Sequence, residues 1–149
     1  MLAITCCLNE ATEDEIAEHL VHCDANFVPP LSSRVKIIDY AKKIAHGATR
    51  FEAWSENRMV GLVAAYCSDH ETRFAYITSV SVLKEWARKG IARKLMKQCI
   101  DHMQCLGLRR ISLEVSIENG AAISLYEKEG FTASSVSESV VVMKLRLNK

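Results

Sequence analysis

The sequence predicts an α/β fold, in which one mixed β-sheet is covered by helices on both faces. Along the chain, segments in which apolar residues recur at helical spacing alternate with segments in which every second residue is apolar, as in a strand. β-Branched and aromatic residues are concentrated in the middle third. With 149 residues, of which 49% are hydrophobic, the chain is long enough for one compact core. We therefore expect residues 1–149 to form a single domain.

The first third of the chain reads as one strand followed by two helices. The letters TEDE at 12–15 form a capping box, in which Thr12 and Glu15 bind each other's backbone N–H groups at a helix start. Pro29 and Pro30 interrupt the pattern, because proline cannot continue a helix. The expected elements are a strand over 3–8, a helix from 12 to about 23 and a second helix from Ser33 to near Gly47.

In the rest of the chain, segments with helical spacing of apolar residues alternate with segments that have the spacing of a strand. Apolar residues recur every three or four positions from Gly90 to Leu106, and Gly107 then provides a helix C-cap. Strict alternation over 111–115 predicts a strand. The expected elements are a meander of 51–54, 60–67 and 74–83, a helix over 90–106, a strand over 111–115, a short helix over 121–128 and a last strand over 140–147.

Composition excludes several classes of function. With 19 basic and 18 acidic residues, the formal net charge is +1, so we expect no nucleic-acid partner and no membrane partner. No apolar run approaches the roughly 18 residues of a membrane span, and the short N-terminal apolar run meets Glu10 without the features of a signal peptide. We therefore expect a cytoplasmic protein.

The cysteines and histidines do not suggest a metal centre or a disulfide framework. The six cysteines lack a CxxC pair and lie in apolar periodic segments, where Cys67 and Cys99 are expected to be reduced core thiols. His19, His22 and Cys23 lie close together on the first helix, but no fourth ligand follows at a suitable spacing. We expect no bound metal.

The letters EWARKGIARKL, at 85–95, place positive charge around a strand-to-helix junction. The first backbone N–H groups of a helix have no partner within the helix, and the helix dipole makes this end positive. Gly90 lets an anion approach the main chain, and Ala92 keeps the next contact small. Three cations, Arg88, Lys89 and Arg93, add charge. The junction therefore predicts a local site for a phosphate group.

A second motif, NGAAISLYEKEGF at 119–131, follows one helix and one strand later. The two motifs together resemble the GNAT family of N-acetyltransferases. The first motif of this family reads [QR]-x-x-G-x-[GA], and its second reads N-x-x-A-x-x-L-Y-x-x-x-G-F. Gly90 and Ala92 match the first motif, whereas Ala87 stands where the family usually has Gln or Arg. The second motif is matched by Asn119, Ala122, Leu125, Tyr126, Gly130 and Phe131.

The resemblance, which covers residues 75 to 131, implies the GNAT acyl-CoA N-acyltransferase fold, whose central, mostly antiparallel sheet has its fourth and fifth strands splayed apart. It also implies acetyl-CoA as cosubstrate. The pantetheine arm would pair with backbone groups at Val80 and Val82. The residues expected to bind the cofactor are Val80, Val82, Arg88, Lys89, Gly90, Ile91, Ala92, Arg93, Asn119 and Tyr126.

The same resemblance suggests catalytic residues. Tyr126 occupies the position of the family tyrosine that faces the sulfur, and a phenol can protonate a departing thiolate at neutral pH. Glu114 points away from the apolar side of its strand and resembles the base of family members that acetylate protein N-termini. A water chain through Ser79, Tyr76, His70 or Glu71 is the alternative to Glu114.

The acceptor is the least defined part of the prediction. An amine attacking acetyl-CoA directly is expected, because no cysteine is placed by the motifs as a covalent relay. The hairpin letters SSVSESVV at 134–141 lack basic and aromatic character, which favours a small amine, amino acid or amino sugar. A protein N-terminus or lysine, and a non-catalytic acyl-CoA sensor, are the alternatives. The loop residues Phe27, Pro29 and Leu31 either cover the acceptor or pack the helices together, and a homodimer is left open.

Overall fold

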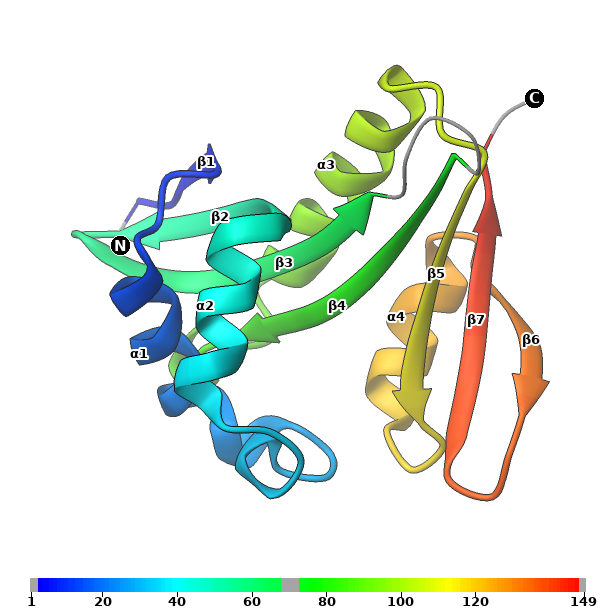
Figure 1. The fold of residues 1–149 in the computed structure, drawn as a ribbon, viewed down its shortest axis with the longest axis horizontal. Helices are drawn as coiled ribbons and strands as arrows, with labels where there is room; N and C mark the ends of the chain where they lie inside the picture. The colour runs from blue at the N-terminus through cyan, green and yellow to red at the C-terminus, as the bar shows by residue number, and fades with distance from the viewer. Residues whose placement is uncertain (1–2, 68–72, 148–149) are drawn as a thin grey trace.

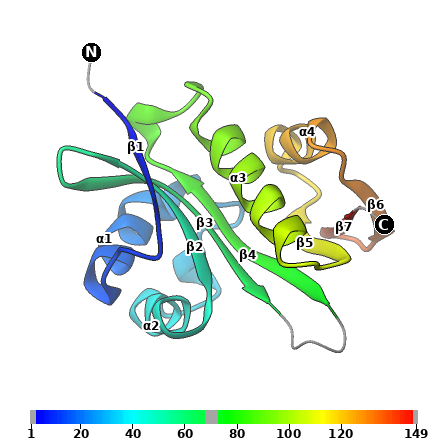
Figure 2. The same cartoon turned by 90° about the horizontal axis from the view of Figure 1, so that it is seen from above.

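The computed structural model describes residues 3–67 and 73–147. They form one seven-stranded sheet with the order β1-β2-β3-β4-β5-β7-β6. Only β4 and β5 run parallel to each other, while every other neighbouring pair is antiparallel. Helices α1 and α2 cover one face and α3 and α4 the other (Figures 1 and 2). The predicted mixed, mostly antiparallel sheet with helices on both faces is confirmed.

The elements follow the predicted order, with the addition of β6, a strand that the sequence analysis did not predict. The strands are β1 (Thr5–Leu8), β2 (Thr49–Ser55), β3 (Arg58–Cys67), β4 (Phe74–Val82), β5 (Arg110–Ser116), β6 (Thr132–Val136) and β7 (Val140–Arg146). The α-helices are α1 (Glu13–Cys23), α2 (Ile37–Gly47), α3 (Ile91–Cys105) and α4 (Gly120–Lys128). Short 3₁₀ turns occur at Asp24–Asn26, Leu31–Ser33 and Lys84–Trp86. None of the helices formed by residues 3–67 and 73–147 is both long and apolar enough to cross a membrane.

The start of α1 is fixed by the predicted capping box. The Thr12 side chain accepts a hydrogen bond from the Glu15 N–H at 3.1 Å, and the Glu15 carboxylate accepts one from the Thr12 N–H at 2.8 Å. Two otherwise unpaired backbone donors are thereby satisfied. The buried Glu52 carboxylate on β2 accepts the Ala11 N–H as well. The capping box thus fixes where α1 begins, and the Glu52 contact attaches this beginning to the sheet.

The second helix begins later than predicted, at Ile37 rather than Ser33. The serines just before it are used by the preceding loop. Asp24 accepts hydrogen bonds from both the backbone N–H and the hydroxyl of Ser32, and the Ser33 hydroxyl donates to the Pro30 carbonyl at 2.6 Å. Because these side chains stabilise the loop, they do not cap a helix. The consequence is a longer loop between α1 and α2.

Two layers of core lie on opposite faces of the sheet. One layer packs α3 and α4 against the sheet through residues such as Leu95, Met96 and Phe131. The other packs α1 and α2 through Ile16, Leu20 and Ile44. The sheet is therefore held rigidly on both faces, except where two of its strands separate.

That separation lies between β4 and β5. Their parallel pairing covers only Phe74–Ile77 of β4 and Arg110–Leu113 of β5. Beyond these residues β4 stays paired with β3 and β5 stays paired with β7, but the two strands diverge (Figure 1). The structure therefore confirms the predicted splay of strands 4 and 5.

Helix α1 holds the diverging part of β4 through His19. This buried ring donates from Nδ1 to the Met59 carbonyl at 3.0 Å. Its Nε2 therefore accepts from the Ser81 hydroxyl, at 2.9 Å, as a neutral imidazole. Burial lowers the pKa of His19 to about 4. The neutral ring is thus part of the native structure.

The pKa of His19 makes stability depend on pH. The unfolded chain takes up a proton at His19 below its ordinary value of about 6.5, whereas the folded chain does so only near pH 4. The free energy of unfolding should therefore fall as the pH decreases from 6.5 to 4, with His19 contributing roughly 3 kcal/mol of the loss. Urea unfolding of wild type and His19→Asn across this range measures the difference in slope. Equal slopes would show that His19 is not held neutral.

Candidate active site

The unpaired side of β4 presents backbone groups to the gap between β4 and β5. Leu83 donates its N–H to the Val60 carbonyl of β3 at 2.9 Å. Because backbone groups alternate between the two sides of a strand, Val82 and Val80 direct theirs away from β3 and toward the gap. No residue of β5 pairs with them in the described sheet. These are the two residues expected to pair with a pantetheine arm.

A bulge in β4 begins the divergence. Ala64 of β3 lies opposite Ser79, and Ala65 lies opposite Ile77, so Thr78 is an extra residue in β4. The phenol of Tyr40 on α2 donates to the Thr78 carbonyl at 2.6 Å and lies 2.7 Å from the Thr78 hydroxyl. Tyr40 therefore holds the bulge from the α1/α2 side. The bulge directs the following part of β4 away from β5.

The N-terminus of α3 points into the space beside this gap. Gly90 is the N-cap with φ of 82°, and no side chain hydrogen-bonds to the cap. A Cβ at Gly90 would meet no atom within 4 Å, so the glycine is required for its backbone angle and not for space inside the fold. Arg88 also has a positive φ of 63°. The first N–H groups of α3 are thus available to an anion.

A cavity of about 560 Å³ lies between β4, α3 and α4. At one end the α3 N-terminus and Arg88 supply positive charge, and at the other the exposed edge of β4 supplies unpaired backbone groups. Its size falls in the usual range of small-molecule sites. The lining residues are Val80, Ser81, Val82, Trp86, Ala87, Arg88, Gly90, Ile91, Ala92, Arg93, Ala121, Ser124, Leu125 and Lys128. We call this space the cofactor cavity.

Ion pairs join the two helices that border the cofactor cavity. Glu129 follows α4, and its side chain is only 4% exposed. It pairs with Arg93 at 3.2 Å and with Lys97 at 3.2 Å, both on α3. These contacts fix α4 against α3. They also mean that Arg93 already has an acidic partner, so its charge is partly neutralised.

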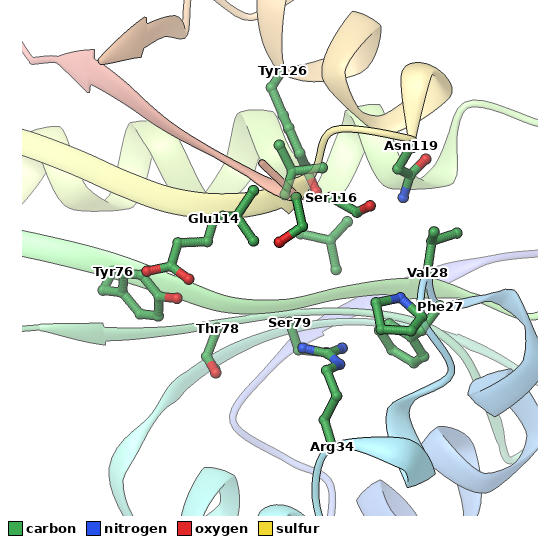
Figure 3. A pocket seen from close by; sticks show the side chains of 15 residues that line it. Phe27, Val28, Arg34, Tyr76, Thr78, Ser79, Glu114, Ser116, Asn119 and Tyr126 are labelled. Atoms are coloured by element: carbon green, nitrogen blue, oxygen red, sulfur yellow. The ribbon is translucent and has the colours of Figure 1, made fainter. Parts of the chain in front are cut away.

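A second cavity, of about 400 Å³, opens on the other side of the splayed strands. Figure 3 shows its side chains converging from the α1–α2 loop, β4, β5 and α4. Val80 lines both cavities, so the two meet at the gap between β4 and β5. The lining residues are Phe27, Val28, Pro29, Arg34, Tyr76, Thr78, Ser79, Val80, Glu114, Val115, Ser116, Asn119, Tyr126, Ser139 and Val140. We call this space the acceptor cavity.

Tyr126 reaches the acceptor cavity from α4. The residue is 7% exposed, and its ring packs against Phe131 with 6.0 Å between ring centroids. Burial raises the pKa of Tyr126 to about 12, so the phenol stays protonated throughout the neutral range. Figure 3 shows its side chain extending from α4 toward the centre of the cavity. A protonated phenol at this position can act as a proton donor.

Glu114 and Tyr76 lie on the neighbouring strands β5 and β4. Tyr76 pairs with Ser112 in the register, and Glu114 lies two residues beyond Ser112 on the same face. Figure 3 shows the Glu114 carboxylate beside the Tyr76 phenol. Burial raises the pKa of Tyr76, and the negative charge of Glu114 raises it further. The pair presents a carboxylate and a protonated phenol to the acceptor cavity.

The structure separates the predicted residues into two groups. Val82, Arg88, Gly90, Ile91, Ala92 and Arg93 line the cofactor cavity, Glu114, Asn119 and Tyr126 line the acceptor cavity, and Val80 lines both.

Lys89 lines neither cavity. The Asn119 side chain accepts the Ala122 N–H at 3.2 Å as the N-cap of α4. Of the three loop residues, Phe27 and Pro29 line the acceptor cavity, whereas Leu31 is buried in the core. Among the alternative base residues, His70 and Glu71 lie outside the described residues.

Sequence reasoning missed two cations at these cavities. Lys128 lies with Ala121, Ser124 and Leu125 on the face of α4 that borders the cofactor cavity. Their spacing of three, one and three residues is the signal that could have identified this face. Arg34 lines the acceptor cavity, but it belongs to a loop with no periodic pattern.

The cysteines are reduced and lie away from both cavities. Each of the six is a free thiol, and no cysteine in residues 3–67 or 73–147 lines either cavity. Cys99 is buried as predicted, whereas Cys67 is exposed because it is the last residue of β3. In the same residues no group of three or more His, Cys, Asp or Glu could hold a metal ion.

Comparisons with known proteins point to one family. Residues 13–131 match the model of the Acetyltransferase (GNAT) family. An N-alpha-acetyltransferase 30 of Schizosaccharomyces pombe is 36% identical over 83 residues, which are 54% of this chain and 55% of that protein. The chain thus spans about half the length of the curated relatives it matches.

Solved structures support the same fold. The ribosomal-protein-S18-alanine N-acetyltransferase of Escherichia coli superposes with a TM-score of 0.77 at 21% identity, covering 100% of this chain and 96% of that one. A Bacillus subtilis acetyltransferase in complex with CoA gives a TM-score of 0.74 at 19% identity, covering 99% and 100%. Since the family model spans most of the chain, the protein belongs to the GNAT family of acetyltransferases, which its two motifs resemble.

Proposed function

We propose that this protein transfers the acetyl group of acetyl-CoA directly to a primary amine, with both substrates bound at once. The observation that carries this proposal is the meeting of two cavities at Val80 in the gap between β4 and β5. A thioester that enters from the cofactor cavity would reach the acceptor cavity at this point. An amine in the second cavity could then attack without a covalent enzyme intermediate.

The cofactor cavity suits the two halves of acetyl-CoA. The pyrophosphate would bind the free N–H groups of Ile91 and Ala92 at the α3 N-terminus, with Arg88 and Lys128 nearby. The amide groups of the pantetheine arm would pair with Val80 and Val82, as an added strand does. A backbone N–H of β4 would also stabilise the oxygen of the thioester as negative charge develops on it.

The acceptor cavity supplies the two proton transfers. An alkylammonium has a pKa near ~10 and must lose a proton before its nitrogen can attack the thioester carbonyl carbon. We assign this step to the Glu114 carboxylate, directly or through water held with Tyr76. When the carbon–sulfur bond breaks, the thiolate leaves and takes the proton of the Tyr126 phenol. The high pKa of Tyr126 keeps this proton in place until then.

Two acceptor classes fit this chemistry. Residues 134–141, around the turn between β6 and β7, favour a small amine, amino acid or amino sugar, because they include no aromatic or basic residue that could bind a polypeptide. The α-amino group of a polypeptide is the second candidate, because the relatives named above are N-alpha- and alanine N-acetyltransferases. A panel of amines, amino sugars and short peptides, with free CoA thiol as the readout, separates the two. If acetyl-CoA binds and no acceptor reacts, the non-catalytic sensor is the better account.

Replacing Gly90 with alanine tests the pyrophosphate site. The Cβ has space in the fold, so the cost to stability comes from the positive φ and should be about 1 kcal/mol. The methyl group would, however, stand where the anion approaches, and we expect acetyl-CoA affinity to fall at least about tenfold.

Gly107→Ala is the matched control, measured by calorimetry in the same way. Gly107 has a φ of 80° at the other end of α3, and a Cβ there also meets no atom within 4 Å. We expect this variant to lose similar stability and to keep its acetyl-CoA affinity. Equal losses of affinity in both variants would place the anion elsewhere.

Replacing Tyr126 with phenylalanine tests the proposed acid. We expect kcat to fall by about a hundredfold or more, because the departing thiolate loses its proton donor, with little change in acetyl-CoA affinity. Tyr66→Phe removes a phenol that lines neither cavity and should leave both quantities unchanged. Steady-state kinetics and a separate binding measurement decide. An unchanged kcat, or equal losses of kcat and affinity, would contradict the assigned role.

A further inference from the structure

The acceptor cavity carries one positive and one negative side chain. Among its lining residues only Arg34 and Glu114 are charged. Glu114 comes from β5 and Arg34 from the segment that leads into α2, so the two charges enter the cavity from different layers of the fold. Figure 3 shows Arg34 extending upward from the loop side and Glu114 on the opposite side of the space. The cavity is therefore electrically polarised.

Both charges act on the same phenol. The negative charge of Glu114 raises the pKa of Tyr76, and the positive charge of Arg34 lowers it. Tyr76 therefore lies within electrostatic reach of both groups. Since Glu114 and Tyr76 are the proposed site of the reacting amine, Arg34 lies near the body of the acceptor and not at a distant part of the surface.

Arg34 is available for an external partner. Its backbone N–H donates to the Leu31 carbonyl at 2.9 Å, which places the residue at the end of the 3₁₀ turn. Its guanidinium forms no ion pair with any acidic residue in the described part of the chain. By contrast, Arg50 pairs with Glu52 and Arg93 pairs with Glu129.

The hydroxyl of Ser79 lies near this arginine and contacts the Tyr40 phenol. Burial raises the pKa of Tyr40, and this contact lowers it. Ser79 is 4% exposed, lines the same cavity, and its hydroxyl makes no hydrogen bond of good geometry with the described residues. A buried hydroxyl that lacks a well-aligned hydrogen bond gains free energy when a ligand supplies one. Figure 3 shows Ser79 and Arg34 together at the lower wall of the cavity. A guanidinium and a hydroxyl form a suitable pair of donors for a carboxylate or phosphate.

We propose that Arg34, assisted by Ser79, binds an anionic group of the acceptor, and that this protein therefore prefers amines that carry a carboxylate or phosphate. The inference rests on the proposed function. The ammonium group of such an acceptor lies toward Glu114, and its anionic group lies toward Arg34. The opposite charges of the cavity orient the acceptor so that its amine faces the thioester.

The test uses pairs of acceptors that differ only in the anion. A free amino acid is compared with its amide, an amino-sugar phosphate with the amino sugar, and a peptide with Asp at its second position with the Asn peptide. We expect kcat/KM to be about ten- to a hundredfold higher for the anionic member of at least one pair, as one charge-assisted contact would give. The pair with the largest ratio of kcat/KM between its anionic and neutral members shows which kind of acceptor carries the anion: an amino acid, an amino-sugar phosphate or an acidic peptide. Ratios near one in every pair would overturn the inference.

Two variants tie the preference to Arg34. Arg34→Ala should remove the preference for the anionic acceptor, while kcat/KM for the neutral acceptor and the KM for acetyl-CoA change less than about threefold. Lys36→Ala is the matched control, because it removes one positive charge from the same segment at an exposed residue outside the cavity. We expect it to keep the preference. An unchanged preference in Arg34→Ala would overturn the inference.

A binding measurement separates this inference from the proposed function. Each acceptor is titrated calorimetrically into the complex with CoA, which has no acetyl group to transfer. Tighter binding of the anionic acceptors to wild type than to Arg34→Ala supports the inference whether or not turnover occurs. Equal binding to the two proteins contradicts it. Binding that depends on Arg34 without any turnover would contradict the proposed function alone.

Discussion

The separation of β4 from β5 is the feature on which both cavities depend. A parallel pair of strands would normally continue its hydrogen bonds along the whole shared length, leaving no unpaired backbone between them. Here the pairing stops at Ile77 and Leu113, directly before the bulge at Thr78. Unpaired backbone groups cost free energy unless water or a ligand satisfies them. The gap is therefore a place where the fold leaves hydrogen-bonding capacity for another molecule.

The helices on the α1/α2 face keep this gap in one geometry. Tyr40 binds the bulge at Thr78, and His19 binds Ser81 farther along the same strand. Both side chains are largely enclosed, and both hold β4 from the face opposite to α3 and α4. The diverging part of β4 is thus fixed by specific contacts and by its pairing with β3. This rigidity places Val80 where the two cavities meet, at the edge of the acceptor cavity that Tyr126 and Glu114 also line.

Local patterns predicted much of the fold and the cofactor side of the site. The capping box at Thr12, the alternation of β5 and the glycine at the start of α3 are signals within a few neighbouring residues, and each gave an element or a turn that the structure contains. The predicted start of α2 at Ser33 was wrong, because Ser32 and Ser33 form loop contacts instead of capping a helix.

The acceptor cavity was less predictable, because it is assembled from segments far apart in the sequence. Phe27 and Arg34 come from a loop, Ser79 from the bulged strand, and Ser139 from the last hairpin. No spacing rule relates such residues, since only the folded sheet brings them together. Lys89 differs from the other predicted cations of the motif, because it lines neither cavity, and its contact with the cofactor stays a prediction.

The most direct test of this account is amide hydrogen exchange with and without CoA. Binding in the gap should slow exchange at Val80 and Val82 and at the first N–H groups of α3, Ile91 to Arg93. Exchange in β1 and at the C-terminal end of α3 should stay unchanged, because these parts lie away from the gap. If CoA binds but leaves the amides of Val80, Val82 and the α3 N-terminus unprotected, then the cofactor does not enter between the splayed strands, and the central claim is wrong.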